Sequence, residues 1–143
     1  MITDVGIDMD GVLYDFAGAF HEYCQNRMEK ELALPSRWDF YQDWGLSDEQ
    51  FQLWLADATK DMRIFMWREP MDGVVEGWKA LREQGVRIHI MTHRHADAYV
   101  QTAQWLEKYN LLPDGLHFGQ NKTILKRFAM DECAAIDDHA PYH

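Results

Sequence analysis

The sequence is poor in cysteine and has no long apolar run. Its 143 residues include only two cysteines, Cys24 and Cys133. Two are too few for a framework of disulfide bonds, and they fit a reducing compartment. The amino terminus lacks a basic region followed by an apolar run, and no stretch approaches the roughly 20 apolar residues that are needed to cross a bilayer. We therefore expect a cytoplasmic protein that has no membrane partner.

Basic residues are also few. The chain carries 14 Lys and Arg against 24 Asp and Glu, which gives a formal net charge of −10. Such a field repels polyanions, so nucleic acid is not a favoured partner. A small phosphorylated substrate that is handled through a bound cation remains compatible with it. Hydrophobic residues make up 47% of the chain, which is enough to bury the core of one domain without disulfides.

Short apolar segments alternate with segments of helical periodicity. Residues 3–8, 86–91, 116–118 and 133–136 are predicted strands, and residues 15–28, 72–84, 97–109 and 122–128 are predicted helices. The helix at 72–84 is expected to bury Val74, Val75, Trp78 and Leu81 and to end at Gly85. Strands that alternate with helices indicate a parallel, Rossmann-like α/β sheet with right-handed crossovers.

One region breaks this alternation. Residues 15–69 are helical in pattern with a break at Leu34-Pro35-Ser36, and Ser47 with Gln50 forms a predicted capping box at the start of a second helix there. We expect this region to be a small helical cap, inserted after the first strand of a single domain whose core is residues 1–14 and 70–143. Ligands of open α/β sheets bind at the carboxyl ends of the strands, beneath such a cap.

Polar residues stand at the ends of several predicted elements. They are Asp8 and Asp10 after the first strand, Thr92 after the second, Lys122 at a helix start, and Asp137 and Asp138 after the last strand. Three clustered carboxylates repel one another unless a hard cation lies between them, and oxygen ligands suit Mg²⁺. The sequence therefore predicts a Mg²⁺ site.

This order of motifs resembles the haloacid dehalogenase superfamily of phosphohydrolases. Four runs are similar to the 5′(3′)-deoxyribonucleotidases: DMDGVLYDF at 8–16, EPMDGVVE at 69–76, Lys122-Thr123, and Ile136-Asp137-Asp138. The resemblance implies a Mg²⁺-dependent phosphomonoesterase that forms an aspartyl-phosphate intermediate. Its substrates are then expected to be small phosphomonoesters, above all nucleoside monophosphates.

The resemblance also implies roles for the acidic residues. Asp8 is expected to be the nucleophile, because a carboxylate beside Mg²⁺ can attack phosphorus without first losing a proton. Asp10 is expected to protonate the leaving oxygen and then to deprotonate water, while its main-chain carbonyl reaches the metal. Asp138 is favoured as the direct metal ligand and Asp137 as a partner linked through water, although the reverse order stays open.

Other residues are expected to hold the substrate. Thr92 and Lys122 would bind the phosphoryl oxygens and stabilise the charge that develops on them. His93 and Arg94 could add N–H groups or a guanidinium near the phosphate; two exposed loop residues are the alternative interpretation. The ring of Phe16 is expected to pack against a nucleobase, with Trp38 or Phe40 as further candidates for which core packing is equally plausible.

The chain departs from the family pattern at two places. His93-Arg94 follows Thr92 where these nucleotidases commonly have Ser-Pro, which leaves the substrate preference open. Relatives usually continue past the Asp-Asp pair into another helix and strand, whereas this chain stops at His143. A truncated chain, a longer protein and a minimal domain are all consistent with this, and an edge element of the sheet could be missing. In a truncated chain the site would lack supporting residues and its activity would be weak.

Two rival functions stay open. The first is another phosphatase of the same superfamily, acting on a polynucleotide 3′ end or on a sugar phosphate. The second is a non-catalytic module that binds a phosphorylated ligand or a protein. The preferred base, the choice between 5′ and 3′ phosphate, and the choice between a monomer and a homodimer are not determined by the sequence.

Overall fold

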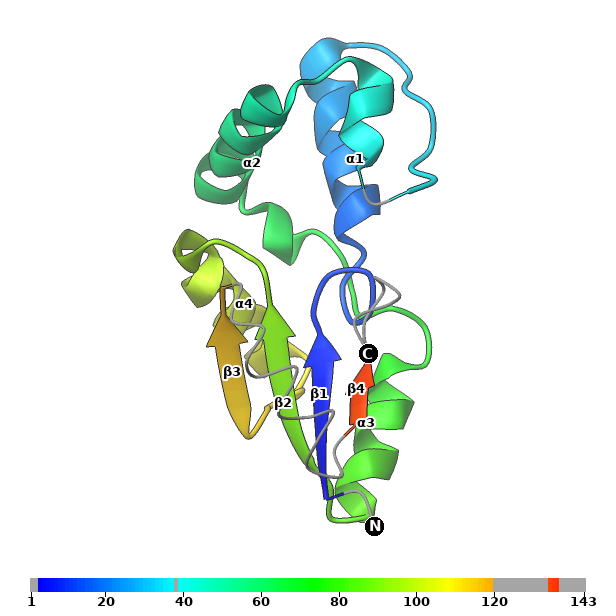
Figure 1. Ribbon diagram of the computed structural model, residues 1–143, viewed down its shortest axis with the longest axis vertical. Coiled ribbons are helices and arrows are strands. Elements are labelled where there is room, and N and C mark those ends of the chain that lie inside the picture. The colour runs from blue at the N-terminus through cyan, green and yellow to red at the C-terminus, as the bar shows by residue number, and fades with distance from the viewer. Residues whose placement is uncertain (1–2, 38, 120–133, 137–143) are drawn as a thin grey trace.

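A parallel sheet forms the centre of the protein. The computed structural model describes residues 3–37, 39–119 and 134–136, the last three by their backbone alone. The strands in this part of the chain are β1 (Asp4–Asp8), β2 (Arg87–Thr92), β3 (Gly115–Phe118) and β4 (Ala134–Ile136). They lie in the order β3-β2-β1-β4, and all neighbouring pairs are parallel (Figure 1). The predicted Rossmann-like α/β fold is therefore confirmed.

The central strands form where the sequence is apolar. Val5 and Ile7 of β1 are almost fully buried, as are Ile88 and Ile90 of β2. Asp8, the last residue of β1, pairs in register with Met91, one residue before the end of β2. The register therefore brings the polar ends of these two strands to the same edge of the sheet.

Two helices cover one face of the sheet. They are α3 (Val74–Glu83), which connects β1 to β2, and α4 (Tyr99–Lys108), which connects β2 to β3 and follows a short 3-10 turn, η3 (Ala96–Ala98). Both crossovers advance in the same direction across the sheet, so right-handed connections place both helices on the same face. Trp78 and Trp105 are the buried aromatic anchors of these helices.

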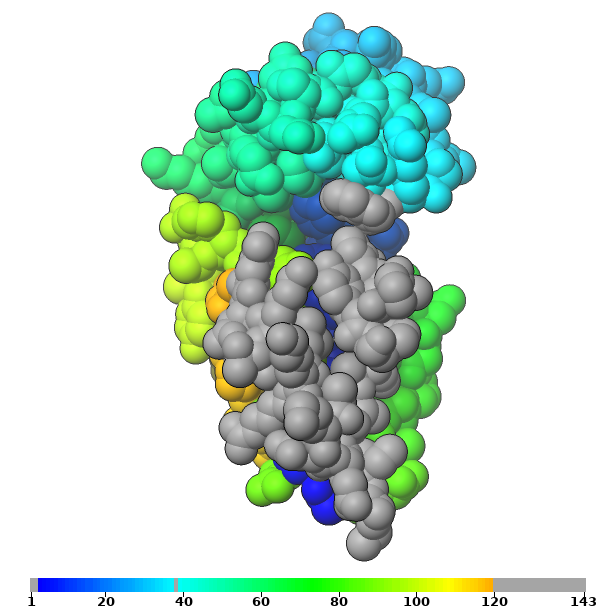
Figure 2. Space-filling view, viewed as in Figure 1, coloured from blue at the N-terminus to red at the C-terminus, as the bar shows by residue number. Residues whose placement is uncertain are grey.

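A group of helices follows β1 and lies beyond the carboxyl ends of the strands. It comprises α1 (Phe16–Met28), η1 (Phe40–Trp44), α2 (Asp48–Met62) and η2 (Ile64–Met66), and it occupies one end of the molecule (Figures 1 and 2). The capping box is confirmed, since Ser47 Oγ accepts from Gln50 N at 3.2 Å and Gln50 Oε1 accepts from Ser47 N at 2.9 Å. These helices form the predicted cap, whereas the domain boundaries stay a prediction.

The structure differs from the sequence-based expectation in α3. The helix begins at Val74 rather than at residue 72, because Gly73 has a left-handed backbone with φ +82°. Val75 was expected in the core, but 47% of it is exposed. Val74, Trp78 and Leu81 follow the i, i+4, i+7 spacing of one helix face, and Val75 lies beside that face.

Several predicted features lie outside the described residues. They are Trp38, the helix at 122–128 with Lys122, and the pair Asp137 and Asp138. In the part of the chain that the structure describes, no helix has the length and apolar character that crossing a membrane requires.

Candidate active site

The Asp8-Met9-Asp10-Gly11 motif forms a tight turn at the end of β1. Met9 O accepts hydrogen bonds from Leu13 N at 2.9 Å and from Tyr14 N at 3.0 Å. The turn needs glycine at position 11, where φ is +83°, because a Cβ would be strained in that conformation. Asp8 Oδ1 accepts from Met9 N at 2.8 Å, so the turn also orients the Asp8 carboxylate. Both aspartates are partly buried.

Thr92 ends the neighbouring strand β2. It is 1% exposed, and its hydroxyl accepts a hydrogen bond from Arg94 N at 3.1 Å. The hydroxyl keeps its own proton to donate. His93, the next residue, is exposed. The structure thus brings three predicted site residues, Asp8, Asp10 and Thr92, to the carboxyl ends of adjacent strands.

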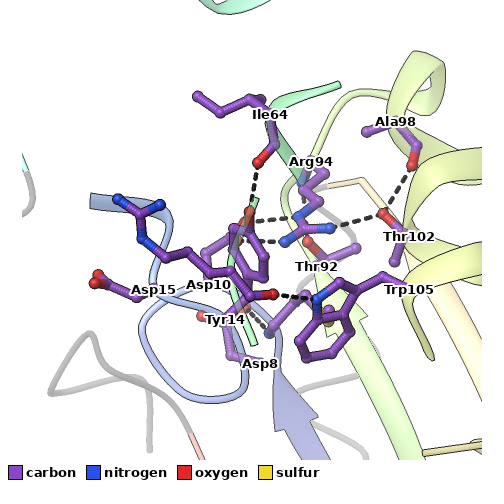
Figure 3. A network of polar contacts seen from close by, with 12 residues as sticks. Asp8, Asp10, Tyr14, Asp15, Ile64, Thr92, Arg94, Ala98, Thr102 and Trp105 are labelled. Carbon is purple, nitrogen blue, oxygen red and sulfur yellow. Dashed lines mark hydrogen bonds and ion pairs between the residues drawn. The ribbon is translucent and has the colours of Figure 1, made fainter. Parts of the chain in front are cut away.

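Arg94 is bound to Asp10 by a two-pronged ion pair (Figure 3). Its Nη2 lies 2.6 Å from Asp10 Oδ1 and its Nε lies 2.9 Å from Asp10 Oδ2. Its Nη1 donates to Thr102 Oγ1 of α4 at 2.8 Å. The Arg94 side chain is only 1% exposed, and its guanidinium carbon lies 3.9 Å from the centre of the Phe65 ring. The sequence placed Arg94 near the site but gave no indication of this partner.

Tyr14 is a residue of the site region that the sequence-based reasoning did not single out. It is fully buried, and its hydroxyl donates to Ile64 O and accepts from Trp67 N at 3.0 Å. Burial raises the pKa of Tyr14 to about 12. Tyr14 therefore connects the segment that leaves the core after β1 to the segment that returns from the cap. The only signal in the sequence that pointed to Tyr14 was its position inside the DMDGVLYDF run at 8–16.

The aromatic candidates lie in the cap and its base. Phe16 begins α1 and is partly buried, with its ring stacked on those of Phe20 at 5.5 Å and Phe65 at 5.7 Å between centroids. Phe40 is 4% exposed and packs against Phe20 and Trp44. Core packing, which was one of the two interpretations of Phe40, is thus what the structure shows.

The donor set suits a hard cation, although part of it lies outside the described residues. Asp8 supplies a carboxylate at the strand end. Within the described ranges, the main-chain carbonyl of Asp10 accepts no hydrogen bond, so it is available to a cation. Oxygen donors of this kind suit Mg²⁺. Among the described side chains no group of three or more His, Cys, Asp or Glu is placed to hold a metal, and the expected third carboxylate, Asp137 or Asp138, is outside them.

The sheet order, the inserted helices and the turn after β1 define a fold shared with hydrolases of the haloacid dehalogenase superfamily. A superfamily hydrolase of subfamily IA from Geobacter sulfurreducens matches with a TM-score of 0.64 at 16% identity, over 99% of this chain and 82% of that chain. A hydrolase from Streptococcus pneumoniae matches with a TM-score of 0.60 at 15% identity, over 99% of this chain and 85% of that one.

The sequence narrows this class to one family. Residues 1–139 match the family described as "5′ nucleotidase, deoxy (Pyrimidine), cytosolic type C protein", and the chain belongs to it. It is also 30% identical, over 129 residues, to a protein of Chlorobaculum tepidum described as "Putative 5′(3′)-deoxyribonucleotidase". That match covers 83% of this chain and 63% of the relative's length. The resemblance that the motifs indicated is confirmed.

Proposed function

We propose that this protein is a Mg²⁺-dependent phosphomonoesterase that hydrolyses nucleoside monophosphates through phosphorylation of Asp8. The observation that carries the proposal is the convergence of Asp8, Asp10 and Thr92 at the ends of β1 and β2. Family membership supports the same activity. The proposal assigns the chemistry to the core, residues 1–14 and 70–143, and the choice of substrate to the cap, and it places the enzyme in the cytoplasm.

The proposed cation would be held by the Asp8 carboxylate, the Asp10 main-chain carbonyl and Asp138, with Asp137 linked through water or taking its place. When bound, Mg²⁺ would reduce the repulsion between the attacking carboxylate and the phosphate dianion. The geometry described above leaves the Asp10 carbonyl available for this role within the described part of the chain.

In the proposed reaction, an Asp8 carboxylate oxygen attacks phosphorus and the bond from phosphorus to the ester oxygen breaks. Asp10 gives a proton to that leaving oxygen, so that the nucleoside departs as an alcohol. Asp10 then accepts a proton from the water that attacks the aspartyl phosphate, which releases inorganic phosphate and restores Asp8. Thr92 and Lys122 are proposed to bind the phosphoryl oxygens, and His93, which follows Thr92 in the chain, is exposed.

Substrate choice is assigned to Phe16. This residue is at the start of α1, eight residues after Asp8, and it is only partly buried. A nucleobase that packs on this ring would leave its 5′ or 3′ phosphate close to the turn after β1. Stacking of a base on an aromatic side chain contributes about 1–3 kcal/mol, which is enough to favour nucleotides over sugar phosphates.

Phosphate release from a substrate panel tests the proposal. The panel contains deoxynucleoside and nucleoside monophosphates, sugar phosphates and 3′-phosphorylated oligonucleotides, each with Mg²⁺ and with EDTA. We expect Mg²⁺-dependent release that is fastest from nucleoside monophosphates. Faster release from sugar phosphates or from oligonucleotides would support a rival phosphatase, and tight binding without turnover would contradict an enzymatic role.

A further inference from the structure

The ion pair between Arg94 and Asp10 is positioned more rigidly than an ordinary surface contact. Two nitrogens of one guanidinium meet the two oxygens of one carboxylate at 2.6 and 2.9 Å. Because both groups are planar, two parallel hydrogen bonds fix the plane of the carboxylate as well as its position. A single bond would leave the carboxylate free to turn about its Cβ–Cγ axis.

Arg94 is itself held from several sides. Its Nη1 donates to Thr102 Oγ1 at 2.8 Å, and that hydroxyl donates in turn to Ala98 O at 2.7 Å. Its guanidinium carbon lies 3.9 Å from the Phe65 ring centre and 5.3 Å from the Tyr14 ring centre. These contacts connect the Asp10 carboxylate, on the loop after β1, to helix α4. The orientation of Asp10 is thus set by an element that is distant in sequence.

We propose that Arg94 is a positioning residue for Asp10: it holds the carboxylate in the plane from which one oxygen exchanges a proton with the leaving group and with water. This inference rests on the proposed function of Asp10. Each carboxylate oxygen keeps a second lone pair after it has accepted from Arg94, so the ion pair leaves Asp10 able to reach a substrate.

The same geometry argues against direct contact between Arg94 and the phosphate. Three nitrogens of the guanidinium already have protein partners, and its side chain is 1% exposed. An arginine that binds the phosphate of a substrate would instead point its free N–H groups into the open site. Arg94 therefore acts through Asp10, which distinguishes it from the phosphate-binding role that the sequence suggested.

A double-mutant cycle on the intact chain tests this inference with p-nitrophenyl phosphate and with a deoxynucleoside monophosphate. Arg94→Lys keeps the charge but cannot form the fork, and we expect kcat to fall about 100-fold, the usual effect of misplacing a reacting group, with KM within about twofold. Asp10→Asn is expected to lower kcat by about 10²–10⁴-fold. Because Arg94 acts through Asp10, the double variant should be no slower than Asp10→Asn alone.

The leaving group supplies a second readout. The p-nitrophenolate ion departs without a proton, whereas a nucleoside alkoxide needs one, so Arg94→Lys should lose more activity on the deoxynucleotide. Arg82→Lys is the matched control, because it makes the same change in the ion pair between Arg82 and Asp114. Asp114 directly precedes β3, so this pair lies at the amino ends of the strands, away from the proposed site. We expect the kcat of this variant to equal that of the wild type.

A second variant guards against misfolding of Arg94→Lys. Thr102→Val replaces the hydroxyl that anchors Nη1 with a methyl group of similar size. We expect a fall in kcat on the order of fivefold, as for one lost hydrogen bond, with no further effect in the Asp10→Asn background. Losses that multiply in the double variants, or a rise in KM with weaker inhibition by inorganic phosphate, would overturn the inference. Full activity of Asp10→Asn itself would instead overturn the proposed role of Asp10.

Discussion

The clearest quantitative prediction concerns the hydroxyl of Tyr14. Tyr14→Phe removes one oxygen and keeps the ring, which is fully buried against Trp105 at 5.4 Å and Phe65 at 6.2 Å between centroids. The hydroxyl donates to Ile64 O and accepts from Trp67 N. Its pKa, which burial raises to about 12, lies far above neutral pH, so the hydroxyl keeps its proton and makes both bonds. The substitution therefore leaves these two main-chain groups with only the long hydrogen bond that joins them to each other, from Trp67 N to Ile64 O at 3.4 Å.

The expected loss follows from these two contacts. A buried group that loses its hydrogen-bond partner costs about 1–3 kcal/mol. Because Ile64 O and Trp67 N keep only the 3.4 Å bond to each other, and Ile64 is fully buried while Trp67 is partly so, we expect the free energy of unfolding to fall by about 1–3 kcal/mol in total. For 143 residues this corresponds to a decrease in Tm of about 3–9 °C.

Urea unfolding followed by tryptophan fluorescence and by circular dichroism measures this change. The matched control is Tyr109→Phe, which removes a hydroxyl that makes no hydrogen bond within the described part of the chain, from a ring packed on Trp105 at 5.1 Å. We expect this control to change stability by less than about 0.5 kcal/mol. A Tyr14→Phe loss as small as that of the control would refute the view that this hydroxyl connects the cap segments.

Three further predictions concern the nucleophile Asp8, the cap residue Phe16, and Asp114 at the amino ends of the strands. Asp8→Asn should abolish turnover while the unfolding midpoint stays close to that of the wild type, as measured by phosphate release and circular dichroism. Phe16→Ala should raise KM for nucleoside monophosphates about tenfold or more, the equivalent of one lost stacking contact, and leave turnover of p-nitrophenyl phosphate unchanged. The N–H of Ile88 and the guanidinium of Arg82 hold the pKa of Asp114 below its usual 3.8, so this carboxylate stabilises the fold above that pH and the contribution disappears as pH falls below it. Asp114→Asn should thus cost about 1 kcal/mol at pH 7, because solvent screens this pair, whose side chains are 35% and 37% exposed. The difference should shrink in urea unfolding as the pH falls below 3.8.

Matched substitutions separate these effects from general damage. Asp97→Asn makes the same change as Asp8→Asn at a side chain that is 81% exposed, and it should keep full activity. Phe51→Ala removes a ring elsewhere in the cap, where it stacks on Tyr41 at 4.1 Å, and it should not alter base discrimination. Near-normal turnover by Asp8→Asn, or equal losses on both substrates for Phe16→Ala, would contradict the corresponding assignment.

Features encoded by neighbouring residues could be predicted from the sequence. The strand that ends at Asp8 was indicated by an apolar segment too short for a helix, and the start of α2 by the Ser47 and Gln50 capping box. The order of acidic, Thr and Lys motifs indicated the family before any geometry was known. Periodicity was less reliable for single side chains, since Val75 was assigned to the core and lies 47% exposed.

The partners of the site residues were decided only by the tertiary structure. Arg94 and Asp10 are 84 positions apart, and Tyr14 and Ile64 are 50 apart. A local pattern can place a polar residue at the end of a strand, but it holds no information about which distant group will satisfy it. That choice depends on the register of β1 against β2 and on the packing of α4 against η2 of the cap, because hydrogen bonds of about 3 Å require the backbones to be positioned first. The sequence by itself thus determined which chemistry this protein carries, and the fold determined how Asp10 is held for it.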